Sequence, residues 1–324
     1  MKGIHYMSPL GTESQEKRLA PQFVVLMLVA VVVLWGINVI MIKYLIHYFP
    51  PLALAGIRIG IAAAFLLPVS LWYYGPVIPP RSSWVPICGV AFLSIFLHQM
   101  ALSWGITATS ATHSVLILGL NPLLTTLLAS WLVNESLSFA KVGGALAGLS
   151  GILLIVVHRV DGSLSSLQGD GIVFIATLTY VLGSLCVKKS TASVPPLMVT
   201  AYSHLLGAMG LLVMGMGLNT EWMYKGAQET GPLVILLFSG LICTGLGTIW
   251  WNTGIHHIGA STAALFLNGQ PIVGVFGSAI FLNEQLAWPH YTALVLVILG
   301  VSVGTGGVSK LVGISPDRGI AKNL

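Results

Sequence analysis

The chain has 324 residues, of which 56% are hydrophobic and only 7% are charged. Soluble globular proteins carry about 25% charged residues, so this composition argues against a soluble enzyme, a nucleic-acid-binding protein and a disordered chain. The net charge is +5, but the cations are dispersed and do not form the cluster that nucleic acid would require. We therefore expect an integral membrane protein surrounded by the lipid bilayer.

Ten apolar stretches are long enough to cross a bilayer, for which a helix needs about 20 residues. In chain order the predicted spans are residues 23–46, 51–73, 84–104, 109–133, 141–158, 170–189, 196–217, 232–253, 260–282 and 289–308. Residues 1–22 and 309–324 are expected to form terminal tails. The predicted fold class is therefore all-α and integral to the membrane, with ten transmembrane helices.

The distribution of Lys and Arg predicts the orientation of the chain. When the N-terminal tail is placed in the cytoplasm, only Lys43, Arg159 and Lys225 fall in outer segments, and most other cations fall on the cytoplasmic side. This is the positive-inside pattern of membrane proteins. We therefore expect a multi-pass protein of the cell membrane with both termini in the cytoplasm.

The chain contains an internal repeat, with one copy at residues 23–158 and the second at 170–308. At offsets of 145 and 149 residues the copies share several short motifs: residues 48–52 with 193–197, Gly105 with Gly254, Pro122 with Pro271, and Asn134-Glu135 with Asn283-Glu284. Each copy has five predicted helices, and because five is odd the second copy must cross the membrane upside down. Such inverted repeats are typical of transporters that bind substrate between the halves. The alternative is a duplication that now serves only packing.

These motifs resemble the EamA-type branch of the drug/metabolite transporter superfamily over about residues 23–308. The residues that carry the resemblance are Leu34-Trp35-Gly36-Ile37-Asn38, Lys43, Pro51, Leu52, Arg58, Asn121-Pro122, Gln270-Pro271, Asn134-Glu135 and Asn283-Glu284. The resemblance implies export or exchange of amino acids or related small metabolites, without identifying the substrate. Ser203 stands where Arg58 stands in the first copy, so the second copy departs from the first there.

Polar residues are costly in lipid and usually face the interior of a helix bundle. Several lie at helical spacing: Ser94 and His98; Thr177, Tyr180 and Ser184; Thr244, Thr248, Trp251 and Asn252. Together with Trp35, Asn38 and Asn268, these stripes are expected to converge on a central cavity with aromatic walls. The alternative is that they only form hydrogen bonds between helices.

Two prolines lie near the middle of matched spans. Pro122 and Pro271 each remove one helical hydrogen bond and are expected to kink the helix, either as hinges or as ordinary packed kinks. The preceding amides, Asn121 and Gln270, would then bond the freed carbonyl groups or a substrate. We predict that both amides contribute to the substrate site.

Titratable residues are few within the spans. His98, His113 and His204 could relay a proton or only bond a neighbouring helix. Arg58 is predicted to lie about 10 Å deep, where it either extends to the membrane surface or faces a substrate carboxylate. No Asp or Glu falls near the centre of a predicted span, and Glu135 and Glu284 are expected to cap helix ends.

The sequence thus predicts a secondary transporter of small polar metabolites, with amino acids as the favoured cargo, working by alternating access through a central cavity. A transporter of sugars, nucleotide precursors or drugs is the first alternative. A lipid-modifying membrane enzyme is the second, but no HExxH motif occurs, and the one match to GxSxG, at residues 300–304, falls inside a predicted span. No metal site and no cofactor are expected, and the oligomeric state is left open, a homodimer being one alternative.

Overall fold

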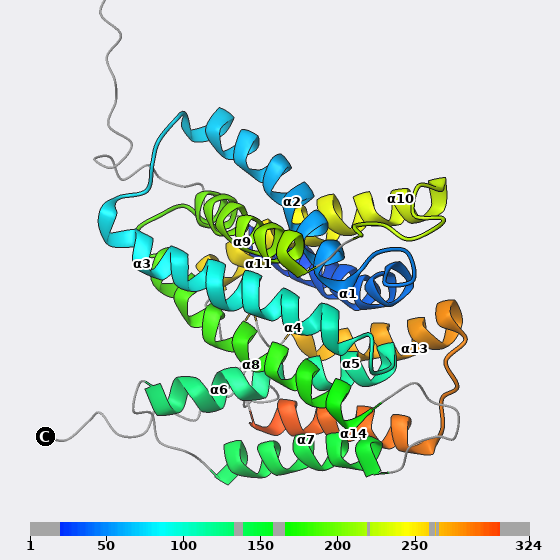
Figure 1. Cartoon of the computed structure of the whole chain (residues 1–324). Coiled ribbons are helices and arrows are strands. Elements are labelled where there is room, and N and C mark those ends of the chain that lie inside the picture. The colour runs from blue at the N-terminus through cyan, green and yellow to red at the C-terminus, as the bar shows by residue number, and fades with distance from the viewer. Residues whose placement is uncertain are drawn as a thin grey trace, which may run out of the picture.

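The computed structural model describes residues 20–132, 139–157, 166–218, 221–258, 263 and 266–304, and within them every regular element is a helix (Figure 1). In the first half the helices are α1 (Pro21–Leu45), α2 (Pro51–Tyr74), α3 (Arg81–Gly89), η1 (Val90–Leu97), α4 (His98–Gly105), α5 (Ala111–Leu118), α6 (Asn121–Leu132) and α7 (Phe139–Val157). In the second half they are α8 (Leu167–Ser190), α9 (Pro196–Leu218), α10 (Thr230–Phe238), η2 (Ser239–Leu246), α11 (Gly247–Ile258), η3 (Leu267–Gly269), α13 (Gln270–Leu282) and α14 (Trp288–Gly304).

Proline and left-handed residues set several of the helix ends. Helices α1 and α2 each begin on a proline, whose missing N–H is not needed in the first turn of a helix. Asn283 takes a left-handed conformation directly after α13, and Gly75 has a positive φ directly after α2. Both are residue types that tolerate this conformation, which ends a helix cleanly.

Six of the described helical segments are long and apolar enough to cross a membrane: Pro21–Leu45, Pro51–Tyr74, Arg81–Gly105, Leu167–Ser190, Pro196–Leu218 and Thr230–Ile258. The remaining four predicted spans coincide with apolar helical segments of 10–17 residues. Six of the predicted spans therefore have the required length in the described chain, and the full set of ten stays a prediction.

The α-helix is interrupted just before each of the two prolines for which a kink is predicted. Helix α5 ends at Leu118 and α6 begins at Asn121, so Pro122 is the second residue of a new helix. Pro271 likewise is the second residue of α13, which follows the single turn η3. Proline fits the first turn of a helix without losing a hydrogen bond, so the sequence starts a helix at both positions. The hinge role of these prolines stays a prediction.

Two segments of π-helix occupy matched positions in the two halves. Segment η1 follows α3 and continues into α4, and η2 follows α10 and continues into α11, at the 149-residue offset of the repeat. A π-helix carries an extra residue per turn and is frequent at functional sites. Both segments contribute residues to the central cavity described below.

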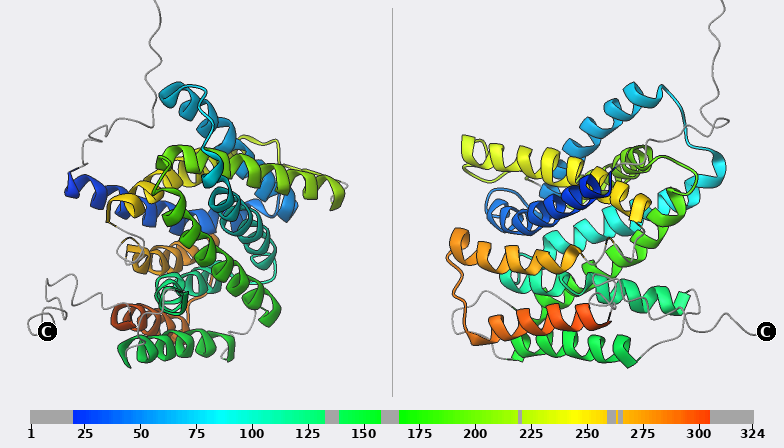
Figure 2. Two further views of the ribbon diagram at one scale, coloured as in Figure 1. Left: turned by 90° about the vertical axis from the view of Figure 1, so that its left-hand side faces the viewer. Right: turned by 180° about the vertical axis from the view of Figure 1, so that it is seen from behind.

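The halves interlock through equivalent contacts. Helix α2 packs against its counterpart α9, and α7 packs against its counterpart α14. Helices α7 and α14 lie side by side at one edge of the bundle (Figure 2). Two further contacts occur twice, once in each direction between the halves. Helix α4 packs on α8, and its equivalent α11 packs on α1. Segment η1 packs on α9, and its equivalent η2 packs on α2. The interior between the pairs is therefore built from both halves, which positions a site there.

Candidate substrate site

A central cavity of about 90 Å³ lies where helices of both halves meet. Of the predicted site residues, nine line it: Trp35, Asn38, His98, Asn121, Tyr180, Ser184, Trp251, Asn252 and Gln270. Arg58, His113 and Asn268 are not among the lining residues. Apart from Thr177, the residues of the stripes predicted from helical spacing therefore converge on this cavity.

One wall of the cavity is aromatic. The ring of Trp35 lies 6.0 Å from that of Tyr180, edge to face, and 5.2 Å from that of Trp251. The indole nitrogen of Trp35 donates to the carbonyl oxygen of Cys243 at 3.0 Å, and His98 lies 5.1 Å from Tyr180. Because these rings come from both halves and hold each other in place, they form a preorganised aromatic surface.

Arg58 lies beside this cavity, fully buried with 0% exposure. Its Nε donates to Ser239 Oγ at 2.8 Å, and its terminal nitrogens donate to Thr244 Oγ1 at 3.3 Å and, weakly, to Gln99 Oε1 at 3.5 Å. This burial excludes the alternative in which the guanidinium extends to the membrane surface. Sequence spacing did not identify Ser239 or Gln99, because both act from other helices.

The charge of Arg58 has no acidic partner within the residues that the structure describes. All of its acceptors are neutral oxygens, and a buried charge is costly unless it is paired. Ser239 in turn donates to Asn38 Oδ1, which lines the cavity. An anionic group in the cavity would therefore gain from this positive charge, directly or through these neutral side chains.

Helices α9 and α11 supply a second set of buried polar groups. Asn252 Nδ2 donates to Thr200 Oγ1 at 2.7 Å, and His204 Nδ1 lies 2.9 Å from the backbone carbonyl oxygen of Thr200. His204 Nε2 and the Oδ1 of Asn121, another residue of the cavity lining, have no hydrogen-bond partner. Thr200 was not predicted from the sequence, since a lone Thr in a helix usually only bonds its own backbone, as it also does here with Pro196.

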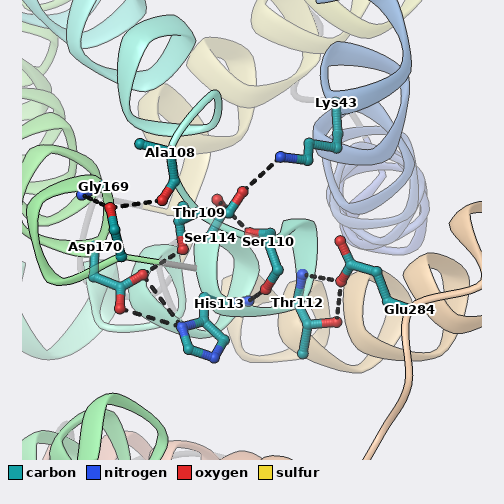
Figure 3. Close-up of polar contacts among 11 residues, drawn as sticks. Lys43, Ala108, Thr109, Ser110, Thr112, His113, Ser114, Gly169, Asp170 and Glu284 are labelled. Atoms are coloured by element: carbon teal, nitrogen blue, oxygen red, sulfur yellow. Dashed lines mark hydrogen bonds and ion pairs between the residues drawn. The ribbon is translucent and has the colours of Figure 1, made fainter. Parts of the chain in front are cut away.

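His113 lies elsewhere, in a polar network that joins the halves at one end of the bundle (Figure 3). Its Nδ1 is 3.2 Å from both carboxylate oxygens of Asp170, which is 3% exposed and also accepts a hydrogen bond from Thr109. Lys43 Nζ donates to the carbonyl oxygens of Ile106 and Thr109 at 2.8 and 2.7 Å. We call Lys43, Thr109, Thr112, His113, Asp170 and Glu284 the inter-repeat network.

Glu284 completes the inter-repeat network by capping a helix of the opposite half. Its carboxylate accepts from the backbone N–H groups of Ala111 and Thr112 at 2.7 and 2.9 Å and from the Thr112 hydroxyl at 2.6 Å. Negative charge at a helix N-terminus is favourable, so the expected capping role of Glu284 is confirmed. Glu135 lies outside the described residues.

Asp170 and Asn268 differ from expectation. The sequence offered no buried acid, yet Asp170 in the first turn of α8 is buried and paired with His113. Asp170 is the first residue of a predicted span, and the sequence pattern gave no reason to expect a residue at a span end to be buried. Asn268 lies in the turn η3 before α13, half-buried and outside the cavity lining, although its Oδ1 also lacks a partner.

Comparison with known proteins gives consistent matches over most of the chain. A model of the EamA-like transporter family matches twice, at residues 22–157 and 167–305. The "Uncharacterized transporter YyaM" of Bacillus subtilis is 28% identical over 285 residues, which cover 87% of this chain and 93% of that protein. The "Probable amino-acid metabolite efflux pump" of Escherichia coli is 23% identical over 284 residues, or 86% and 93% of the two chains.

A solved crystal structure superposes with a TM-score of 0.66 over 90% of this chain and 99% of that chain, at 18% identity. At that identity the likeness shows the fold alone. The double match to one family model agrees with the internal repeat found in the sequence. Together with the long apolar helices, these matches show a multi-pass membrane protein that handles small molecules in a lipid environment.

Proposed function

This chain belongs to the EamA-like transporter family, and from that premise we propose that it is a secondary transporter of small polar metabolites at the cell membrane. Amino acids or their derivatives are the proposed cargo, exported or exchanged, and both termini lie in the cytoplasm. The observation that carries the proposal is the cavity between the two halves, which combines an aromatic wall with buried polar groups.

The charge at the cavity supports an anionic group on the cargo. Arg58 is buried with only neutral acceptors in the described chain, and Ser239 connects it to the cavity residue Asn38. A carboxylate would compensate this charge, whereas an organic cation would be repelled by it. The name of the relative from Escherichia coli, "Probable amino-acid metabolite efflux pump", agrees with this choice of cargo.

Alternating access is the proposed mechanism, with ten spans arranged as two inverted five-helix repeats. The inter-repeat network joins α5 of one half to α8 and to Glu284, shortly after α13, of the other, and in this proposal it closes the cavity at that end. Opening that end requires these bonds to separate while the opposite end closes. The equivalent contacts of the two halves favour such an exchange, because each half can adopt the arrangement of the other.

Flux through proteoliposomes tests this function. We expect saturable uptake of labelled amino acids, and a loss of about tenfold for Trp251→Ala and Asn252→Ala, as expected when about 1.4 kcal/mol of binding is removed. Trp72→Ala is the matched control, since Trp72 is 86% exposed and far from the cavity lining. Flux of sugars or organic cations, with none for any amino acid, would contradict the proposed cargo.

A further inference from the structure

In the cavity wall formed by α9 and α11, the hydrogen bonds determine which polar atoms donate and which accept. The hydroxyl of Thr200 donates to the carbonyl oxygen of Pro196 at 2.7 Å, so toward any other group it can only accept. The amide of Asn252 therefore turns its Nδ2 to Thr200, at 2.7 Å, and its Oδ1 away from it. Thr200 thus fixes Asn252 with the amide oxygen as the remaining acceptor.

The same residue fixes the ring of His204. The backbone carbonyl of Thr200 can only accept, so the Nδ1 of His204, 2.9 Å away, carries the proton. In the neutral ring Nε2 is then an acceptor, and it is buried without a partner. His204 is 1% exposed and Asn252 is 2% exposed, and both line the cavity. This wall therefore presents unused acceptors, for which a ligand must bring hydrogen-bond donors.

The opposite half presents the reverse polarity. Arg58 of the first half donates to the hydroxyl groups of Ser239 and Thr244, and its equivalent in the second half is the neutral Ser203, the neighbour of His204. One half therefore offers a positive charge at this level, and the other offers neutral acceptors. A cargo with an anionic group at one end and a donor group at the other would satisfy both.

We propose that His204 and Asn252 form the acceptor site for the ammonium group of an amino-acid cargo, and that Thr200 is their positioning residue. The inference rests on the proposed function and deepens it, because it names the atoms that accept hydrogen bonds from the amine. Asn121, which lines the same cavity, has a further unpartnered acceptor in its Oδ1. No carboxylate takes part among the described lining residues.

The test compares cargo that differs only in the donor group. Labelled alanine, leucine and phenylalanine are each assayed in proteoliposomes beside the corresponding 2-hydroxy acid and 2-oxo acid, with empty liposomes as background. We expect the wild-type protein to carry the amino acid at least about tenfold faster than the 2-oxo acid, because a buried acceptor left without a donor disfavours the analogue. The 2-hydroxy acid, with one weaker donor, is expected between the two.

Variants then assign the preference to residues. His204→Phe and Asn252→Leu are expected to lower amino-acid flux about tenfold and to bring the ratio of amino acid to 2-oxo acid near one. Thr200→Val should reduce the ratio several-fold, and Thr200→Ser should restore it, which a merely space-filling role would not do. His257→Phe is the matched control, since His257 bonds the carbonyl of Thr253 in the same way at 2.9 Å but lies outside the cavity lining.

The outcomes separate the two proposals. Equal flux of amino acids and 2-oxo acids in the wild type, or an unchanged preference in a folded His204→Phe protein, overturns the acceptor site but leaves amino-acid transport standing. No flux of any of the three amino acids overturns the proposed cargo and the acceptor site together. Monodisperse elution in detergent identifies the folded variants, and the 2-oxo acid flux shows that they remain active.

Discussion

At the scale of single residues, Arg58 has the most unusual environment. A fully buried guanidinium normally needs an ion pair, yet its described partners are Ser239, Thr244 and Gln99, all neutral. Two of these partners are satisfied without it, because Ser239 donates to Asn38 and Thr244 donates to the backbone of Ser239. The surrounding structure therefore does not depend on the arginine, and its charge is available to a ligand.

We predict that Arg58→Met abolishes amino-acid flux but leaves the melting temperature in detergent unchanged or raised. Removing a buried, unpaired charge relieves its desolvation cost, and methionine fills a similar shape. Arg58→Lys should retain part of the flux, since it keeps the charge but loses the planar arrangement of donors. A fall of several kcal/mol in stability, with flux retained in the folded fraction, would show that Arg58 serves the fold instead.

At the scale of helices, close packing through glycine holds η1 in place between α8 and α9. A methyl group added at Gly207 of α9 would overlap the side chain of Ile95, and one added at Gly183 of α8 would overlap Ser94. Small residues let helices in membranes approach closely, because packing replaces the hydrophobic effect there. The π-helical segment therefore depends on two glycines of the opposite half.

We predict that Gly207→Ala destabilises the folded protein by about 1–3 kcal/mol, because Ile95 and the backbone of Ala91 leave no room for a methyl group. Gly217→Ala in the same helix is the matched control, since nothing lies within 4 Å of the added methyl group. Thermal unfolding in detergent, followed by circular dichroism, measures both. Equal melting temperatures of the two variants would contradict the close packing.

At the scale of the whole molecule, polar contacts between the halves lie beside the start of the third predicted span and near the start of the fourth. Thr112 Oγ1 is 2.6 Å from Ser278 Oγ near the inter-repeat network, and Ser83 Oγ is 3.1 Å from Ser193 Oγ at the start of α3. Each pair joins a residue of the first half to one of the second. If the halves exchange conformations, each contact must separate during part of the cycle.

We predict that a disulfide at either pair stops transport. In a background without Cys88, Cys186 and Cys243, the double variants Thr112→Cys/Ser278→Cys and Ser83→Cys/Ser193→Cys should lose flux on oxidation and recover it on reduction. The single-cysteine variants, treated alike, are the controls. Full flux in a protein whose cross-link is verified by mass spectrometry would contradict alternating access at that end.

Sequence reasoning reached the helices, the repeat and most residues of the cavity, because hydropathy and helical spacing are local properties. It missed the π-helical segments, since no residue type separates a π-helix from an α-helix. It also missed the pairing of His113 with Asp170, whose positions differ by 57 residues and whose contact is set by helix packing. Thr200 gained its positioning role only through Asn252, 52 residues away.

The environment of Arg58 also has a consequence for biosynthesis. The arginine leaves the ribosome 181 residues before Ser239 and 186 residues before Thr244, and only its weakest hydrogen-bond partner, Gln99, belongs to the first half. A charged side chain is costly at depth in lipid until such partners arrive. Until η2 has been synthesised, Arg58 in α2 must therefore be shielded by the insertion machinery or held closer to the membrane surface. The first half therefore reaches its final position in the membrane only after the second half supplies the partners of Arg58.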